Sequence, residues 1–208
     1  MKAVIIIGAS GHGKVVADIV NKSKDKIIGF LDDNPDIGNE FVGFPVLGTI
    51  SKYKDYIDQA EFIIAIGNAI VRKKIAEQLC EVKWYTAIHP TAVISEINVT
   101  INEGTVIMAN AVINPGAVIG KHCIINSSSV VEHDDFIGDY SHVSVGAKLA
   151  GTVCVGELSW IGIGACVSNN INICEGCMIG AGAVVITDIT EKGTYVGVPA
   201  KRVKGECE

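Results

Sequence analysis

The 208-residue sequence predicts an N-terminal α/β domain followed by an all-β parallel β-helix. The first prediction rests on alternating strand and helix patterns up to about residue 86, with a glycine-rich turn after the first strand. The second rests on a six-residue repeat that runs from Ile101 to Val184 without interruption. The pattern changes from mixed to repetitive near His89-Pro90, so we place the domains at 1–86 and 87–208.

The N-terminal segment has the pattern of a strand, a glycine turn and a helix. Lys2–Ile7 is aliphatic almost throughout, as in a buried parallel strand, and Lys14–Asn21 has apolar residues at helical spacing. Between them, Gly8–Gly13 precedes a helix N-terminus whose free N–H groups could bind an anion. Its glycine spacing is G-x-x-G-x-G, whereas dinucleotide-binding turns have G-x-G-x-x-G, so we do not expect an NAD site.

Further elements complete a Rossmann-like domain. In order, we expect a strand at Lys26–Leu31, a short loop at Phe44–Gly48, the start of a helix at Ser51–Tyr56, a strand at Glu61–Ile66 and a helix at Ala69–Cys80. Three strands would then direct their carboxyl ends at one crevice, which carries Gly8–Gly13, Asp32-Asp33 and Gly67-Asn68. The two aspartates either accept hydrogen bonds from a ribose or a base, or cap the following turn.

The six-residue repeat defines the C-terminal domain. Each hexad begins with an aliphatic residue, and the residue four places further on is mostly small. The aliphatic positions are Ile101, Ile107, Ile113, Ile119, Ile125, Val131, Ile137, Val143, Leu149, Val155, Ile161, Val167, Ile173 and Ile179. We expect three hexads to form one triangular coil, with the aliphatic side chains pointing inward and the small residues beside them.

Composition excludes several classes of function. The net charge of −6 provides no basic surface for nucleic acid, and no apolar run reaches the roughly 18 residues that span a bilayer. The apolar N-terminus fits a buried strand better than a signal peptide, and the odd number of cysteines, seven, predicts reduced thiols and a cytoplasmic location. Cys174 and Cys177 share one hexad without a second pair nearby, so we interpret them as structural and expect no metal site.

One hexad, Val131–Phe136, departs from the repeat. Glu132 is the only charged residue at the first offset, and Asp135 is charged where its counterparts are mostly small and uncharged. Together with His133 and Asp134, they place three carboxylates and an imidazole in one turn. An imidazole titrates near neutral pH and can act as a general base, with a carboxylate orienting its other nitrogen. The alternative is a solvated corner of the solenoid.

Several segments together resemble one family of enzymes. They are Gly8–Gly13, Leu31-Asp32-Asp33, Ala65–Asn68, Asn126–Ser129, Glu132–Asp134, Ser141–Ala147 and the terminal Gly197–Lys201. The hexads and the terminal motif resemble the left-handed β-helix acyltransferases. The remaining motifs are similar to the subgroup that contains sialic acid O-acetyltransferases and UDP-N-acetylbacillosamine N-acetyltransferases. The resemblance covers essentially the whole chain, and it implies a left-handed coil, acetyl-CoA as co-substrate and a homotrimer.

The resemblance also implies roles for individual residues. His133 would be the general base, and Asp134 stands where the relatives have a glutamate, so Glu132 or Asp135 could orient the ring instead. By matching position, acetyl-CoA would be contacted by His142, Ile163 and Ala181. The nucleotide of a sugar substrate would be held by Ser10, Gly11, His12, Asp32, Asp33 and Gly67. The other two histidines, His89 and His122, have no matching role and are taken as structural.

These features predict an acetyltransferase of glycan biosynthesis. The leading hypothesis is acetyl-CoA-dependent N-acetylation of a UDP-linked 4-amino-4,6-dideoxy sugar. It is carried out by a trimer in which His133 of one subunit meets the cofactor groove of its neighbour. An O-acetyltransferase acting on sialic acid or a related sugar with the same base is the alternative. A non-catalytic trimeric scaffold that binds nucleotide sugars is a third hypothesis.

Overall fold

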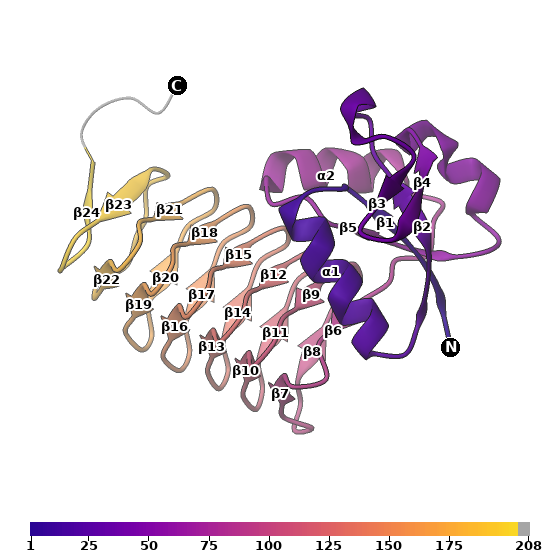
Figure 1. Cartoon of the computed structure of the whole chain (residues 1–208). Coiled ribbons are helices and arrows are strands. Elements are labelled where there is room, and N and C mark those ends of the chain that lie inside the picture. Colours follow the sequence, from indigo (N-terminus) through magenta and orange to yellow (C-terminus); the bar gives the residue numbers. More distant parts are fainter. Residues whose placement is uncertain (204–208) are drawn as a thin grey trace.

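The structure is a computed structural model, and it describes residues 1–203. The chain forms a helix-flanked sheet at its N-terminus, followed by a stack of coils (Figure 1). The predicted order of a Rossmann-like α/β domain and a parallel β-helix is therefore confirmed. The domain boundary at residue 86 stays a prediction, and the first strand of the β-helix begins at Ala87. Of the seven cysteines, Cys207 lies outside the described residues.

The N-terminal sheet has five strands in the order β3-β4-β2-β1-β5. Its elements are β1 (Ala3–Ile7), α1 (Gly11–Lys22), β2 (Lys26–Leu31), the 3-10 helix η1 (Pro35–Ile37), β3 (Glu40–Phe41), β4 (Phe44–Gly48), the 3-10 helix η2 (Ile50–Tyr56), β5 (Glu61–Ile64) and α2 (Ala69–Gln78). Strands β4, β2, β1 and β5 run parallel, so their carboxyl ends meet at one edge of the sheet.

Several N-terminal segments differ from the prediction: the helix expected to start at Ser51–Tyr56 is the 3-10 helix η2, β5 ends at Ile64 and α2 ends at Gln78. Phe44–Gly48 is strand β4 rather than a loop, because its pairing with β2 outweighs the turn-like proline and glycine in its sequence. Helix α1 begins at Gly11, three residues before the predicted start. A Cβ on Gly13 would lie 2.3 Å from the carbonyl oxygen of Gly8, so only glycine lets this first helical turn pack against the end of β1.

The β-helix has three flat faces of short strands. The first face holds β6 (Ala87–Ile88), β9 (Val106–Ile107), β12 (Ile124–Ile125), β15 (His142–Val143), β18 (Trp160–Ile161), β21 (Met178–Ile179), β23 (Thr194–Val196) and β24 (Lys201–Arg202). The second face holds β7 (Val93–Ile94), β10 (Val112–Ile113), β13 (Val130–Val131), β16 (Lys148–Leu149), β19 (Cys166–Val167) and β22 (Val184–Val185). The third face holds β8 (Thr100–Ile101), β11 (Val118–Ile119), β14 (Phe136–Ile137), β17 (Cys154–Val155) and β20 (Asn172–Ile173).

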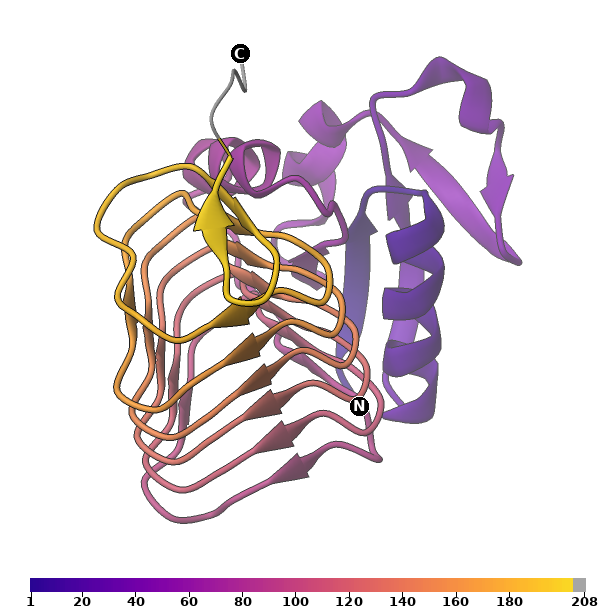
Figure 2. The same ribbon diagram turned by 90° about the vertical axis from the view of Figure 1, so that its left-hand side faces the viewer.

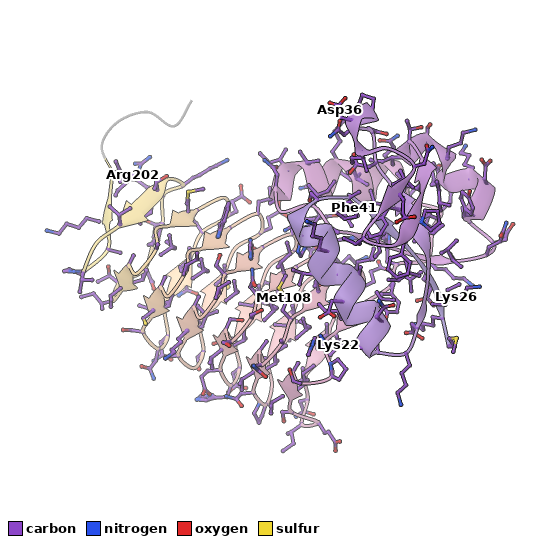
Figure 3. The ribbon with its side chains drawn as sticks, viewed as in Figure 1. Lys22, Lys26, Asp36, Phe41, Met108 and Arg202 are labelled. Atoms are coloured by element: carbon purple, nitrogen blue, oxygen red, sulfur yellow. The ribbon has the colours of Figure 1, made fainter. Side chains whose placement is uncertain are left out.

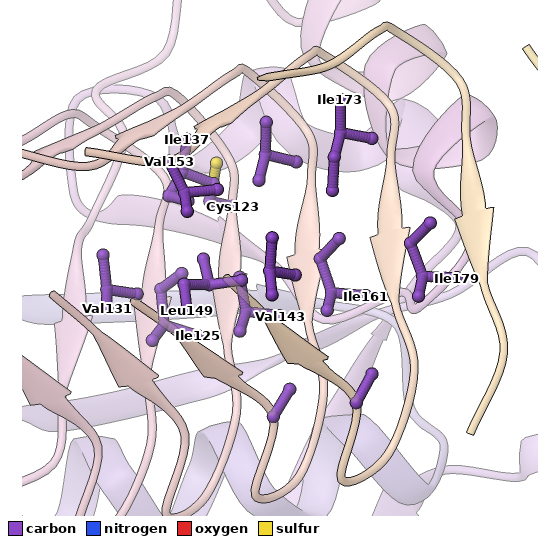
Figure 4. Close-up of a cluster of buried hydrophobic side chains, with 14 of the residues drawn as sticks. Cys123, Ile125, Val131, Ile137, Val143, Leu149, Val153, Ile161, Ile173 and Ile179 are labelled. Carbon is purple, nitrogen blue, oxygen red and sulfur yellow. The ribbon is translucent and has the colours of Figure 1, made fainter. Parts of the chain in front are cut away.

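The repeat positions have the roles that the sequence predicts. Ile125 pairs in parallel with Val143, three hexads later, so three hexads form one coil. The aliphatic positions from Ile107 to Ile179 are at most 3% exposed, and their side chains line up inside the coils (Figure 4). The small residues at the fourth offset are also buried, as Ala147 shows. Burial of this aliphatic ladder provides most of the driving force for stacking the coils.

The corners of the coils have a fixed backbone conformation. The third residue after each aliphatic position has a positive φ, from Gly104 at 72° to Gly182 at 66°. Non-glycine residues also adopt it, among them His122 at 52° and Asp134 at 61°. Because every coil turns in the same way, the corners stack along the axis of the β-helix (Figure 2). Side chains at equivalent corners therefore lie one above another.

The N-terminal domain covers one end of the first face. The outward side chains of Val106 and Ile124 are 1% exposed because they join Val16 and Val20 of α1 in one apolar cluster. Met108 belongs to this cluster and lies beside α1 (Figure 3). Beyond β15 the same face is open to solvent, and its outward residues Trp160 and Met178 are exposed.

Candidate active site

The sequence-predicted residues of the β-helix fall on different stacks of corners. The dyad corner, between the second and third faces, includes residues 132–135. The groove corner, between the first and second faces, includes residues 162–165 and 180–183. The docking corner, between the third and first faces, includes residues 120–123 and 138–141. The second face therefore separates the dyad corner from the groove corner within one chain.

His133 and Asp134 form a hydrogen-bonded pair on the dyad corner. Nδ1 of His133 lies 2.9 Å from Oδ2 of Asp134, and both side chains are more than half exposed. The hydrogen bond to the Asp134 carboxylate raises the pKa of His133 above its ordinary value. In the neutral ring this bond places the proton on Nδ1, so the lone pair of Nε2 is available to accept a proton.

The other two carboxylates of this hexad bond to backbone groups. Oε2 of Glu132 accepts the N–H of His133 at 3.1 Å. The Asp135 carboxylate is buried and accepts the N–H groups of Glu132 at 2.8 Å and Val153 at 2.7 Å. Its burial raises the pKa of Asp135 to about 7. Asp134 is therefore the carboxylate that lies against the ring, and Asp135 joins the corner to the next coil.

Two glycines leave room for the His133–Asp134 pair. A Cβ on Gly151, at the equivalent place one coil later, would lie 2.4 Å from Nε2 of His133. A Cβ on Gly116, one coil earlier, would lie 2.4 Å from Oδ1 of Asp134. Ordinary van der Waals contact begins at about 3.5 Å, so neither position accepts a side chain without moving the pair.

An apolar groove lies on the open part of the first face, next to the groove corner. It encloses about 260 Å³ and is lined by Trp160, Gly162, Ile163, Met178, Ile179, Gly180 and Ala181. Ile163 projects from the corner and is 60% exposed. A Cβ on Gly162 would lie 2.4 Å from the carbonyl oxygen of Ile179, so successive coils approach closely at the floor of the groove. A narrow apolar groove of this kind suits a slender, flexible chain.

His142 lies where the groove meets the N-terminal domain. Its ring stacks on Trp160 with the ring centres 5.2 Å apart, and Nε2 lies 3.0 Å from Nδ2 of Asn126. Burial lowers the pKa of His142 to about 3, and the nearby positive charge of Arg72 acts in the same direction. Within residues 1–203, Nδ1 of His142 and Nε2 of His12 are buried without a hydrogen-bond partner. Two neutral rings from different domains thus each hold a buried ring nitrogen that has no partner within the described part of the protein.

A crevice of about 360 Å³ lies at the carboxyl ends of β1, β2 and β5, where α2 faces them. Gly8, Asp32 and Asp33 lie on its strand side, and Lys74 and Gln78 lie on its helix side. Oδ2 of Asp32 accepts the Ala9 N–H at 2.7 Å, and Oδ1 of Asp33 accepts the Ile50 N–H at 2.8 Å. Both aspartates therefore cap backbone groups, and their role in substrate binding stays a prediction.

The predicted site residues form two groups. Ile163 and Ala181 line the groove, and His142 stacks on Trp160, which also lines it, while His12 of the N-terminal domain lies near the His142 ring. His133 lies apart from them on the dyad corner. In the N-terminal domain, Ser10, Gly11 and Gly67 are exposed, and none of the three is among the residues that line the crevice.

Three residues of the site were not predicted from the sequence: Trp160, Lys74 and Arg72. Trp160 occupies the outward position just before an aliphatic hexad residue, so an exposed tryptophan there was a detectable signal. Lys74 faces the crevice only because α2 turns that side toward β1. Arg72 is buried, although arginine in a surface helix is normally solvated, and no sequence pattern indicates this.

The cysteine pair fits the structural interpretation. The Cys174 and Cys177 sulfur atoms are 3.4 Å apart at the docking corner, and burial raises the pKa of Cys177 to about 12. Within residues 1–203, no three histidine, cysteine, aspartate or glutamate side chains gather in a way that could hold a metal ion. In the same part of the chain, no helix has the length and apolar character needed to cross a membrane.

Each of the two parts of the chain matches a known protein family. Residues 3–79 match the PglD N-terminal domain, and residues 98–133 match the bacterial transferase hexapeptide (six repeats). A curated relative, UDP-N-acetylbacillosamine N-acetyltransferase of Bacillus subtilis (strain 168), is 42% identical over 115 residues. The match covers 52% of this chain and 52% of that protein, so the chain spans about half the length of this curated relative.

Two solved structures are similar over nearly their whole length. The acetyltransferase domain of PglB from Neisseria gonorrhoeae FA1090, in complex with acetyl coenzyme A, is 36% identical with a TM-score of 0.92. The match covers 97% of this chain and 99% of that one. PerB from Caulobacter crescentus, in complex with CoA and GDP-perosamine, is 33% identical with a TM-score of 0.92, and the match covers 98% of each chain.

Proposed function

The chain belongs to the hexapeptide-repeat, left-handed β-helix sugar acetyltransferases with a PglD-type N-terminal domain, and we propose the following reaction for it. It transfers the acetyl group of acetyl-CoA to the amine of a UDP-linked 4-amino-4,6-dideoxy sugar. The relatives support this assignment, since one is a UDP-N-acetylbacillosamine N-acetyltransferase and another binds CoA and GDP-perosamine.

The observation that carries the proposal is the exposed His133–Asp134 pair, 2.9 Å apart and held between two glycine positions. Nε2 of His133 accepts a proton from the sugar amine while the amine nitrogen attacks the thioester carbonyl carbon. Asp134 keeps the proton of the neutral ring on Nδ1 and stabilises the imidazolium that forms. The C–S bond then breaks, and the imidazolium returns the proton to the sulfur of the departing CoA, which leaves as the thiol.

The two remaining binding functions are assigned to the crevice and the groove. Residues 1–86 form a nucleotide-sugar-binding domain, in which Asp32 and Asp33 line the crevice and Ser10, Gly11, His12 and Gly67 contact the nucleotide from beside it. The groove beside His142, Ile163 and Ala181 holds acetyl-CoA. Its narrow, apolar shape fits the pantetheine arm, and the stacked Trp160 and His142 rings border it.

A homotrimer completes the site in this proposal. The dyad corner and the groove corner lie on opposite edges of the second face, so His133 does not face the groove of its own chain. A threefold arrangement would bring the dyad corner of one copy against the groove corner of the next. Light scattering on the purified, active protein measures its oligomeric state. Full activity in a monomer would contradict a shared site.

We also place the reaction in the cytoplasm. The six cysteines in the described part of the chain are free thiols, which fits a reducing compartment.

The reaction is tested with a panel of acceptors and a colorimetric assay of CoA thiol release. The panel contains UDP- and GDP-linked 4-amino-4,6-dideoxy sugars and free sialic acid. We expect turnover with a nucleotide-linked amine. Turnover with sialic acid alone would replace the proposal by O-acetylation. Binding of nucleotide sugars without turnover of any acceptor would support a non-catalytic scaffold.

His133→Ala tests the role of the base. General-base catalysis predicts a loss of about 10²- to 10⁴-fold in kcat/KM, whereas a scaffold or a solvated corner predicts no change. Glu175→Ala is a matched control, because Glu175 is an exposed corner residue at the same hexad offset on another corner stack. We expect its kcat/KM to remain within about twofold of wild type.

A further inference from the structure

The side chain of Arg72 is the largest fully buried one in the described part of the chain, with an exposure of 1%. It projects from the first turn of α2, in the N-terminal domain. No carboxylate among residues 1–203 forms an ion pair with it. Burial lowers the pKa of Arg72 to about 10, so the guanidinium remains charged at neutral pH. A buried charge without a counter-ion is costly unless polar groups surround it.

The guanidinium is surrounded by backbone carbonyls from both domains. Nη1 donates to the carbonyl oxygens of Ile66 and Gly67, both at 2.9 Å, in the loop between β5 and α2. Nε donates to the His122 carbonyl at 2.8 Å, and Nη2 donates to the Tyr140 carbonyl at 2.5 Å. Four of the five N–H groups of arginine are thus used, two toward each domain.

These four carbonyls lie next to both candidate binding regions. Ile66 lines the crevice at the carboxyl ends of the strands, and Gly67 is a predicted substrate-binding residue. On the other side, Tyr140 is two residues before His142, which borders the groove. One planar cation therefore fixes the loop of the N-terminal domain against the strand that carries His142.

We propose that Arg72 is a positioning residue that holds the nucleotide-sugar crevice in register with the acetyl-CoA groove. The inference rests on the proposed function, because the reaction requires the sugar amine and the thioester to meet at a fixed separation. Arg72 touches neither reactant in this proposal. It acts through the Gly67 loop and the His142 strand, and its charge also helps to keep the His12 and His142 rings neutral.

The aromatic contacts at the docking corner provide an independent reporter. The Trp84 ring packs edge-on against His122, with centres 4.6 Å apart, and His122 stacks on Tyr140 at 5.4 Å. Trp84 pairs with Phe62 at the edge of the N-terminal sheet, so its surroundings depend on how the two domains dock. The chain has two tryptophans, and Trp160→Phe leaves Trp84 as the sole tryptophan.

The test uses Arg72→Met, which removes the charge and all donors, and Arg72→Lys, which keeps the charge but loses the planar fork. Lys73→Met is the matched control. Lys73 also joins the two domains, through a 3.2 Å ion pair with Glu157, but this pair is partly exposed and is expected to contribute little.

We expect both Arg72 variants to bind UDP alone and CoA alone with Kd values within about threefold of wild type. Turnover of the amino sugar should fall by about 10²-fold in kcat, because a displacement of about 1 Å between reactants has that effect. In the Trp160→Phe background, Trp84 emission should shift to longer wavelength in the Arg72 variants. Lys73→Met should match wild type in all three measurements.

Three outcomes would overturn the proposal. The first is turnover within threefold of wild type in both Arg72 variants. The second is loss of UDP or CoA binding by itself, which would make Arg72 part of one binding site. The third is loss of the folded state in both variants by circular dichroism, which would make Arg72 a folding residue. If the wild-type protein turns over no acceptor, only the proposed function fails. In that case, Trp84 emission that is unchanged in the Arg72 variants would by itself contradict the positioning role of Arg72.

Discussion

Replacing Gly151 by alanine should inactivate His133 without changing His133 itself. The Cβ of an alanine at position 151 would lie 2.4 Å from Nε2, the atom that accepts the proton in the proposed reaction. Contact distances begin at about 3.5 Å, so the ring has to move by about 1 Å. A displacement of that size from the productive geometry costs about 10²-fold in rate. We therefore expect kcat to fall by about two orders of magnitude.

Stability should change little in this variant. Gly151 does not have a positive φ, and alanine already occupies the same hexad offset at Ala109 and Ala181. The His133 ring is 56% exposed, so it can swing toward solvent rather than compress the core. We expect the midpoint of thermal unfolding to remain within a few degrees of wild type, which separates a local displacement from misfolding.

The assay is steady-state acetyl transfer to the best acceptor of the panel, combined with a double-mutant cycle. If Gly151→Ala acts through the imidazole, it should have no further effect in a His133→Ala background. Asn169→Ala is the control, since Asn169 occupies the equivalent corner position one coil later. Wild-type activity in Gly151→Ala, or an equal loss in the presence and absence of His133, would refute the assignment of Nε2 as the proton acceptor.

Two further predictions concern the carboxylate partner and the core. Asp134→Asn should move the acidic limb of the kcat/KM profile to lower pH, because the Asp134 carboxylate raises the pKa of His133 and a base is active only when unprotonated. A limb that stays in place would contradict the pairing. Ile173→Ala should lower the free energy of unfolding by about 2–5 kcal/mol, since Ile173 is 2% exposed inside the coil. Asn172 is the outward neighbour of Ile173, and Asn172→Ala should change the free energy of unfolding by no more than about 0.5 kcal/mol. Equal losses for the two variants in urea titrations would contradict the inward orientation of Ile173.

The fold was predictable because its main constraint is local and repeated. Each aliphatic hexad residue, such as Ile125 or Val143, faces inward for the same reason, so one pattern determines the strand, the corner and the stacking of the coils. In the N-terminal domain the same approach failed at Phe44–Gly48. There the pairing partner, β2, decides the conformation, and local composition indicates a turn.

The candidate base was predictable because it breaks the repeat. Charged residues at Glu132 and Asp135 depart from what a tightly packed solenoid prefers, and such departures mark positions with a special role. The same sequence left three carboxylates as possible partners of His133. The distances separate them, because Asp134 lies against the ring and Asp135 points into the coil toward the Val153 N–H.

By itself, the sequence determined the two domains, the inward ladder from Ile101 to Ile179 and the one hexad that carries the imidazole. Only the tertiary structure decided that His133 lies on a different corner from the groove beside His142, and that Arg72 is buried between the domains. The physical reason is how far apart in the chain the interacting residues lie. Hexad periodicity is a property of neighbouring residues, whereas the environment of Arg72 consists of carbonyls that are up to 68 residues distant in the chain.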